Sequence, residues 1–276
     1  MNICCNNDNH KFKGIENSPL GLGYSPKKLD NGTIMLGKDK NIWFVKETKN
    51  NKIWYKLDFD NLAKNCYVPV FFPQVELLET EYEETGLEDK FCGNKPFFIE
   101  GETWPTSNNG TLMTFICQFR NPLSRSKKEL VRIFLPVDNY NALCDFECHI
   151  TKINLNSTNL KKQIILENKE VKTSYPTYLI KNWNKNKELK SLEFFCEKFN
   201  LDERSTLLDD YYDKSSYVPS FNNKVGGTPT YCQYFKNIES KNHLIQISES
   251  EVIPYLFGDC GIIHFYENLE FYWDCS

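Results

Sequence analysis

Residues 224–233 read Lys224-Val225-Gly226-Gly227-Thr228-Pro229-Thr230-Tyr231-Cys232-Gln233. They are followed by an apolar run with one glutamine, Leu244-Ile245-Gln246-Ile247, and by the turn Gly258-Asp259-Cys260-Gly261. That turn leads directly into the apolar run 262–266. Two glycines before a proline favour a tight turn, because glycine adopts positive φ and proline fixes the chain as it enters a strand.

An earlier part of the chain repeats this order in a looser form. Cys92-Gly93-Asn94-Lys95-Pro96-Phe97 is followed by the run 113–119, which contains Gln118, and then by the apolar run 130–135. Each copy has a glycine turn that ends in proline, a strand with one glutamine and an apolar strand. Two copies are too few for a solenoid, and they predict two pseudo-equivalent halves that pack together.

These motifs resemble the YwqG-like family, a domain of unknown function. The matching motifs are Gly226-Gly227-x-Pro229, the glutamine Gln246, Gly258-Asp259-x-Gly261-x-x-x-Phe265, Trp104-Pro105, Asn109-Gly110 and Met113-Thr114-Phe115-Ile116-Cys117-Gln118. Cys92 stands where the family usually has glycine, and Phe257 stands where it often has tryptophan. The resemblance covers residues 62–276. It implies a fold and gives no activity.

Some of the same phrases are similar to those of the programmed-cell-death-two-like proteins. The shared phrases are the Gly-Gly-x-Pro turn at Gly226 and the run from Met113 to Gln118. Proteins of that family serve as chaperones of a ribosomal protein. This resemblance implies a role in binding another protein.

We expect an α+β fold made mainly of antiparallel sheet, with connecting helices between the halves. The expected segments are a flexible N-terminus (1–17), a small β-hairpin module (18–57), and the YwqG-like domain (62–276) with halves of about 62–149 and 215–276 and a connector of about 150–214. The run 192–199 has apolar residues at helical spacing, which places helices in the connector. Pro69 and Pro73 favour an edge strand or an extended approach to the domain.

The N-terminal module has a resemblance of its own. The phrase from Gly32 to Trp54 resembles a short module found in many proteins of large DNA viruses. Two aromatic runs around Asn50-Asn51 predict its hairpin. The resemblance implies a viral protein that resides in the host cytoplasm or the virion.

Composition limits the classes of partner. The net charge is −4 and the isoelectric point is about 5.7, whereas nucleic-acid binders usually carry a basic face, so that we expect no nucleic acid. The start of the chain lacks the charged and apolar regions of a signal peptide, and no window is apolar enough to span a membrane. We therefore expect no membrane association and a cytoplasmic location. Eleven cysteines without a secretion signal favour reduced, buried thiols.

Asp259, Cys260 and His264 are the candidates for catalysis. Such a set supports nucleophilic chemistry when the three side chains meet in the right geometry. The alternative is structural: Asp259 anchors the turn by accepting backbone N–H bonds, and His264 is a core histidine. We expect Asp259 to have the structural role, because it lies between two glycines.

Gln118, Gln233 and Gln246 are the candidates for contact with a ligand or partner. A glutamine in an apolar strand needs hydrogen-bond partners if it is buried. Its amide then either bridges neighbouring backbone or lines a cleft between the halves. Gly226, Gly227, Pro229, Gly258, Gly261, Trp104 and Pro105 are interpreted as structural residues of the motifs.

No metal or cofactor is expected. Cys144-x-x-x-Cys148-His149 is the one spacing with possible zinc ligands, and zinc sites usually pair two such clusters. Gly226-Gly227 lacks the helix that a phosphate-binding turn requires.

The expected function is a non-catalytic protein-binding module of adaptor or chaperone type, with an unidentified protein as partner. A hydrolase or transferase that acts from a cleft between the halves is the second alternative. A virion-associated structural protein is the third.

Overall fold

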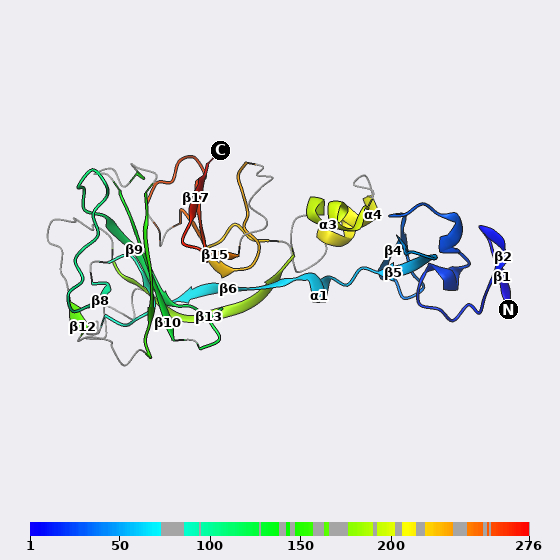
Figure 1. The fold of residues 1–276 in the computed structure, drawn as a ribbon, viewed down its shortest axis with the longest axis horizontal. Helices are drawn as coiled ribbons and strands as arrows, with labels where there is room; N and C mark the ends of the chain where they lie inside the picture. Colours follow the sequence, from blue (N-terminus) through cyan, green and yellow to red (C-terminus); the bar gives the residue numbers. More distant parts are fainter. Residues whose placement is uncertain are drawn as a thin grey trace. The chain divides into compact units, whose positions relative to one another are not determined.

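The structure of the chain is a computed structural model. It describes residues 1–72, 86–93, 95–126, 128–137, 142–143, 147–156, 163–165, 176–189, 192–201, 206–213, 219–233, 242–250, 253 and 255–275. The chain divides into two compact units, drawn with their labels in Figure 1, which are Met1–Lys64 with Lys187–Pro219 and Asn65–Asn186 with Ser220–Ser276. Part of the expected connector 150–214 lies outside the described residues.

The first unit is built on a small antiparallel sheet. Its elements are β1 (Asn2–Cys4), β2 (Asn7–Phe12), η1 (Pro19–Leu22), η2 (Pro26–Lys28), β3 (Ile34–Leu36), β4 (Ile42–Glu47), β5 (Lys52–Lys56), α1 (Phe59–Leu62), α3 (Leu192–Phe199) and α4 (Thr206–Asp213). Strands β3, β4 and β5 pair in that order, and the turn between β4 and β5 contains Asn50-Asn51. Residues 1–17, expected as a flexible segment, contain the antiparallel pair β1–β2.

Helices α3 and α4 pack against the N-terminal sheet. Ile42 and Phe44 of β4 share a buried cluster with Cys196 of α3 and Leu208 of α4. The rings of Phe44 and Phe199 lie 5.3 Å apart. We expected these helices to connect the two halves of the larger domain. They belong to the first unit instead, because a three-stranded sheet must bury its apolar face against another element.

The second unit is built on one ten-stranded sheet. Its strands are β6 (Lys64–Phe71), β7 (Lys90–Phe91), β9 (Thr114–Arg120), β10 (Glu129–Leu135), β11 (His149–Asn154), β13 (Tyr178–Glu188), β14 (Lys224–Gly226), β15 (His243–Ser248), β16 (Ile262–Tyr266) and β17 (Phe271–Asp274). A separate antiparallel pair joins β8 (Phe97–Ile99) to β12 (Gln163–Ile165). The expected predominance of antiparallel sheet is confirmed.

The strand order of the large sheet is β11-β10-β9-β7-β13-β6-β14-β15-β16-β17. Strands β7, β9, β10 and β11 lie on one side of the central strands β13 and β6, and β14, β15, β16 and β17 lie on the other. β6 comes first in the chain but pairs with β14, and β13 comes later but pairs with β7. β6 is therefore an interior strand of this sheet. Pro69 therefore does not lie in an edge strand, and Pro73 lies outside the described residues.

The sheet curls around the larger of the two apolar clusters described in this unit. Phe119 and Ile133 from one side of the sheet lie in the same buried cluster as Ile245 and Phe265 from the other. The two ends of the sheet also meet through loops, because Leu143 N–H donates to the Leu256 carbonyl at 3.1 Å. The curl thus buries one face of every strand group against the others.

Candidate functional site

Two turns of the second unit hold adjacent residues in the left-handed region. Cys92 and Gly93 have φ values of 56° and 85°, and Gly226 and Gly227 have values of 74° and 70°. Left-handed backbone is ordinary for glycine and uncommon for cysteine. The predicted role of Gly226 and Gly227 in a tight turn is thus consistent with their backbone, and Cys92-Gly93 adopts the same conformation without the first glycine.

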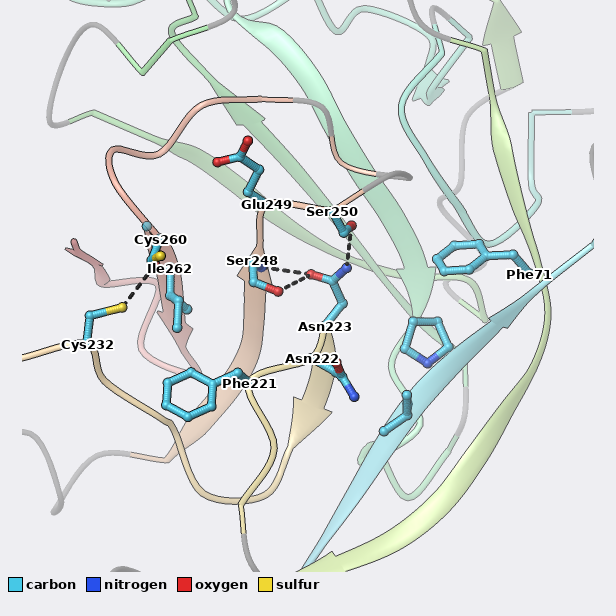
Figure 2. Close-up of a pocket in the computed structure, with 13 residues that line it drawn as sticks. Phe71, Phe221, Asn222, Asn223, Cys232, Ser248, Glu249, Ser250, Cys260 and Ile262 are labelled. Atoms are coloured by element: carbon cyan, nitrogen blue, oxygen red, sulfur yellow. Dashed lines mark hydrogen bonds between the residues drawn. The ribbon is translucent and has the colours of Figure 1, made fainter. Parts of the chain in front are cut away.

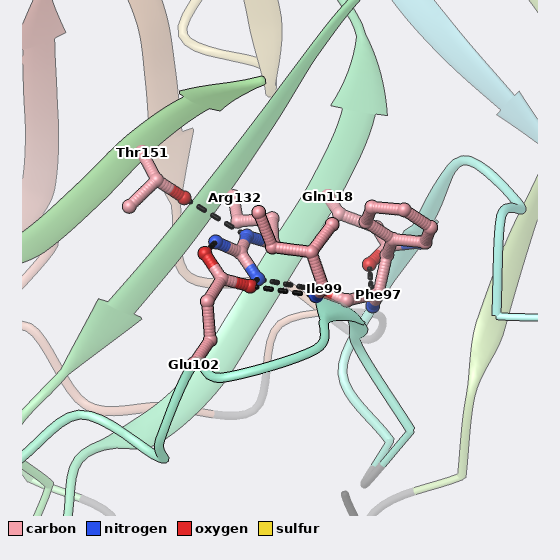
Figure 3. A network of polar contacts seen from close by, with 6 residues as sticks. All are labelled: Phe97, Ile99, Glu102, Gln118, Arg132 and Thr151. Carbon is pink, nitrogen blue, oxygen red and sulfur yellow. Dashed lines mark hydrogen bonds and ion pairs between the residues drawn. The ribbon is translucent and has the colours of Figure 1, made fainter. Parts of the chain in front are cut away.

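Gln118 is fully buried and bridges three backbone groups. Its Oε1 accepts from Phe97 N–H at 2.7 Å, as Figure 3 shows. Its Nε2 donates to the carbonyls of Gly86 at 2.8 Å and Glu88 at 2.7 Å. Both ends of the amide are engaged inside the fold, so that Gln118 bridges backbone and offers nothing to a ligand.

Gln246 is fully buried in the same manner. Its Oε1 accepts from the backbone N–H and the hydroxyl of Thr230, both at 2.9 Å. Its Nε2 donates to the carbonyls of Ser220 at 3.3 Å and Asn222 at 3.2 Å. Of the three candidate glutamines, only Gln233 is exposed, and its amide donates to the Cys275 carbonyl at 2.7 Å.

The two glutamine networks use the same offsets along the chain. Gln118 lies opposite Lys90 in the sheet, and Gln246 lies opposite Lys224. In each network the amide donates to the carbonyls four and two residues before that lysine. Each also accepts from the N–H of the residue that follows a proline, Pro96 or Pro229.

A further pair of bonds follows the same rule. Asp89 Oδ1 accepts from Arg120 N–H at 2.9 Å, and Asn223 Oδ1 accepts from Ser248 N–H at 2.8 Å. The two acceptors each come one residue before the lysine, and the two donors each come two residues after the glutamine.

The Gln118 and Gln246 regions differ in how far each pairs with its central strand, β13 or β6. The ladders pair Tyr178 with Phe91 and Leu179 with Lys90 on one side, and Tyr67 with Val225 and Cys66 with Gly226 on the other. In the first ladder, Ile180 N–H then donates to the Asp89 carbonyl at 2.8 Å. The matching position in the second ladder is Pro69, which has no N–H. Among the described residues, the pairing of β6 with β14 ends at Tyr67.

A pocket of about 830 Å³ lies at this place. Val68, Pro69 and Phe71 of β6 line one side, as Figure 2 shows for Phe71. Phe221 and Ile262 line the other, and Phe221 is 57% exposed. The sheet has therefore opened next to the proline and exposes apolar side chains in the gap.

The polar groups of the pocket are tied to one another. The Asn223 amide donates to the Ser250 hydroxyl at 3.3 Å, and its oxygen accepts from Ser248 (Figure 2). Glu249 is the one charged side chain among the lining residues, and it is exposed. The pocket is thus mainly apolar with an acidic group at its rim.

Arg132 and His264 occupy matching positions opposite the two glutamines. Arg132 pairs with Gln118, and His264 pairs with Gln246. Arg132 is buried and makes a two-pronged ion pair with Glu102, at 2.7 and 2.9 Å (Figure 3). Burial opposes the charge of Glu102, but the hydrogen bonds from Arg132 and from the Ile99 backbone lower its pKa overall.

His264 makes no such ion pair with any residue that the structure describes. Its ring lies 4.7 Å from the ring of Tyr231 and 5.6 Å from that of His243. Neither ring nitrogen meets hydrogen-bond geometry with a described residue, although the Thr230 backbone lies near enough to favour the charged form. Burial first, then His243 and Lys224, hold the pKa of His264 well below its usual value. The ring is therefore neutral at physiological pH.

The structure does not bring the side chains of the catalytic candidates Asp259, Cys260 and His264 together. Cys260 lines the pocket, and His264 does not. The His264 nitrogens form no hydrogen bond with Asp259 or Cys260, both of which are exposed. Cys260 and His264 lie at opposite ends of the five-residue stretch 260–264, and Cys260 is exposed whereas His264 is fully buried.

Asp274 is a buried carboxylate that no sequence motif indicated. It accepts from the backbone N–H groups of Cys232 and Gln233, the latter at 3.3 Å. This is the role that we predicted for Asp259. The Asp259 turn itself is closed by a backbone bond from Gly261 N–H to the Gly258 carbonyl at 3.3 Å. No sequence signal distinguished Asp274, because its partners are about 40 residues away.

The remaining motif residues have structural contacts. The Trp104 indole donates to the Met113 carbonyl at 2.6 Å, and the Pro105 carbonyl accepts from Met113 N–H at 3.0 Å. A Cβ at Gly261 would lie 1.8 Å from the Phe257 carbonyl oxygen, and one at Gly258 would press on Cys275. Only glycine fits at Gly261.

Metal ligands do not cluster in the part of the chain that the structure describes. There, no three His, Cys, Asp or Glu side chains lie together in a way that could hold a metal ion. Cys148 and His149 are described, and Cys144 lies outside the described residues.

Comparison with known proteins adds no assignment. No protein-family model matches the chain, and no curated protein is significantly similar to it. Among the described helices, none has the length and apolar character needed to cross a bilayer.

Proposed function

We propose that the chain is a non-catalytic protein-binding module that holds an extended apolar segment of a partner protein in the pocket between β6 and β14. The observation that carries this proposal is the pocket at Pro69, where β6 has no N–H to offer to β14. Its volume of about 830 Å³ lies within the range of ligand pockets, roughly 300–1,000 Å³. A few residues of an extended peptide would fill it.

The residues that line the pocket favour a peptide segment with apolar side chains next to a basic one. Val68, Phe71 and Ile262 offer aliphatic and aromatic surface, and Phe221 is an exposed aromatic residue at the rim. Covering a large apolar side chain contributes about 1.5–3 kcal/mol. Glu249 at the rim favours a segment that carries lysine or arginine beside its apolar residues.

We also propose that the second unit consists of two related halves, one of residues 65–154 and the other of residues 178–186 with 220–274. The shared offsets of the Gln118 and Gln246 networks support this relationship. In this proposal each half contributes its first strand, β6 or β13, to the strand group of the other half. The same motifs are those that resemble the YwqG-like family, and membership in that family is part of the proposal.

A displayed library of extended peptides tests the binding proposal. The immobilised protein should enrich peptides with apolar residues next to a basic one. Fluorescence anisotropy should then show at least about tenfold weaker binding to Phe221→Asp, because the change places a charge on the apolar rim.

Leu269→Asp is the matched control. Leu269 is also exposed and apolar, belongs to the same unit and does not line the pocket. It should bind the peptides as the unchanged protein does. Enrichment of no peptide, or equal affinity for Phe221→Asp and the unchanged protein, would refute the proposal.

A further inference from the structure

Three cysteines gather beside the pocket although they are far apart in the sequence. The Cys232 thiol donates to the Cys260 carbonyl at 2.9 Å (Figure 2). Cys275 lies next to the same turn, because a Cβ at Gly258 would be 2.8 Å from the Cβ of Cys275. Cys232 and Cys260 both line the pocket, and Cys275 does not.

Cys232 and Cys260 are neighbours in space. A carbonyl oxygen lies about 2.4 Å from the Cα of its own residue. The Cys232 sulfur is therefore at most about 5.3 Å from the Cα of Cys260. In a disulfide each sulfur lies roughly 4 Å from the Cα of the partner residue, as the S–S bond length of about 2 Å requires. Rotation of the Cys260 side chain and a small movement of its exposed turn can bring the sulfurs together.

We propose that Cys232 and Cys260 form a reversible disulfide when a hydroperoxide oxidises the protein. The bond would tie the segment that carries Phe221 and Cys232 to the turn before β16. Both segments line the pocket, so that the disulfide would fix two of its walls relative to each other. This consequence for binding rests on the proposed function, whereas formation of the disulfide does not.

The order of the two steps follows from exposure. Cys260 is exposed and reacts first. Its thiolate attacks one peroxide oxygen, the O–O bond breaks, hydroxide leaves, and a sulfenic acid forms. The Cys232 sulfur then attacks the Cys260 sulfur, the S–O bond breaks, and water leaves with the proton of the second thiol.

In total, two thiols lose two protons and two electrons, and one hydrogen peroxide becomes two waters. Burial, followed by Asp274, raises the pKa of the Cys232 thiol. Cys232 is thus the poorer first nucleophile and the natural resolving thiol.

Peptide mapping of the full chain tests this assignment. The reduced protein is treated with hydrogen peroxide, remaining thiols are alkylated, and the digest is analysed without reduction. We expect a linked pair of peptides that contain Cys232 and Cys260, a loss of two hydrogen masses, and full reversal by dithiothreitol.

Cysteine variants define the pair. Cys275→Ser should keep the link, as should Cys5→Ser, which removes an exposed cysteine of the first unit. Cys260→Ser should abolish it. A link from either residue to Cys275, or oxidation of Cys260 to the sulfinic acid with Cys232 still free, would overturn the proposal.

Binding measurements separate the two proposals. Selected peptides are tested on the reduced and the oxidised protein. A linked pair in a protein that binds no peptide would sink the proposed function and support the disulfide. Peptide binding without the linked pair would support the proposed function and overturn the disulfide.

Discussion

Pro69 occupies in β6 the register position that Ile180 occupies in β13. Ile180 donates its N–H to the Asp89 carbonyl, and Pro69 has no N–H to donate to the matching residue, Asn223. The first ladder reaches this position through that bond, and the second ends before it. One missing donor thus coincides with the place where the sheet opens into a pocket.

Replacing Pro69 by isoleucine should close the pocket. The Pro69→Ile variant gains an N–H that can reach the Asn223 carbonyl, as Ile180 reaches Asp89. We expect stability to stay equal or to rise by about 0.5–1.5 kcal/mol, the net value of one hydrogen bond. The affinity for the selected peptides, measured by fluorescence anisotropy, should fall at least about tenfold. Pro69→Ala restores the N–H with a small side chain, and its affinity should fall in parallel. Unchanged affinity in both variants would show that the proline does not hold the pocket open.

Loss of either buried glutamine should have a similar effect on stability. Gln118→Leu and Gln246→Leu each leave several buried backbone groups without their partner. We expect each to lower the free energy of unfolding by about 3 kcal/mol, since one unsatisfied buried group costs about 1–3 kcal/mol. Urea denaturation measures both. Gln233→Leu, whose amide is exposed, should change stability little. A large effect in only one of the two buried positions would argue against related halves.

The two aspartates of the C-terminal region should differ in the same assay. Asp274→Ala removes a buried acceptor of the Cys232 and Gln233 N–H groups, and hydrogen bonds to a charged group contribute about 1.5–3 kcal/mol. Asp259 is exposed, and Asp259→Ala should therefore cost less than Asp274→Ala. Thermal denaturation compares them. An Asp259 effect as large as that of Asp274 would instead support the anchoring role that the sequence predicts for Asp259.

His264 should make stability depend on pH near neutrality. The pKa of His264 is held well below the usual value in the folded protein, so that its ring stays neutral near pH 6.5. In the unfolded chain the same ring takes up a proton below about pH 6.5. Protons then favour the unfolded state, and stability is lost as the pH falls. Between pH 7.5 and 5.5 this loss is on the order of 1 kcal/mol. His264→Phe should flatten the curve by that amount, as measured by urea denaturation at several pH values. Equal slopes for variant and unchanged protein would contradict the burial of a neutral ring.

The local features of the second unit followed from the sequence. A single glutamine in an apolar strand must find partners when buried, and this requirement marked Gln118 and Gln246 as equivalent. Glycines next to proline marked the turn at Gly226, where backbone φ is positive. These predictions rest on the preferences of one residue and its neighbours. The same reasoning left open whether the glutamines bridge backbone or contact a ligand, and the buried contacts answered that question.

Long-range pairing was decided only by the tertiary structure. Nothing in the sequence indicated that β6 pairs with β14 and β13 with β7, because backbone groups pair alike whatever side chains they carry, proline excepted. The same holds for α3 and α4, whose apolar faces suit any complementary surface and which pack on the N-terminal sheet. Asp274, the thiols beside the pocket and the pocket itself depend on residues brought together from distant segments. Sequence thus determined where the chain turns and which faces are buried, and tertiary packing determined which segments meet.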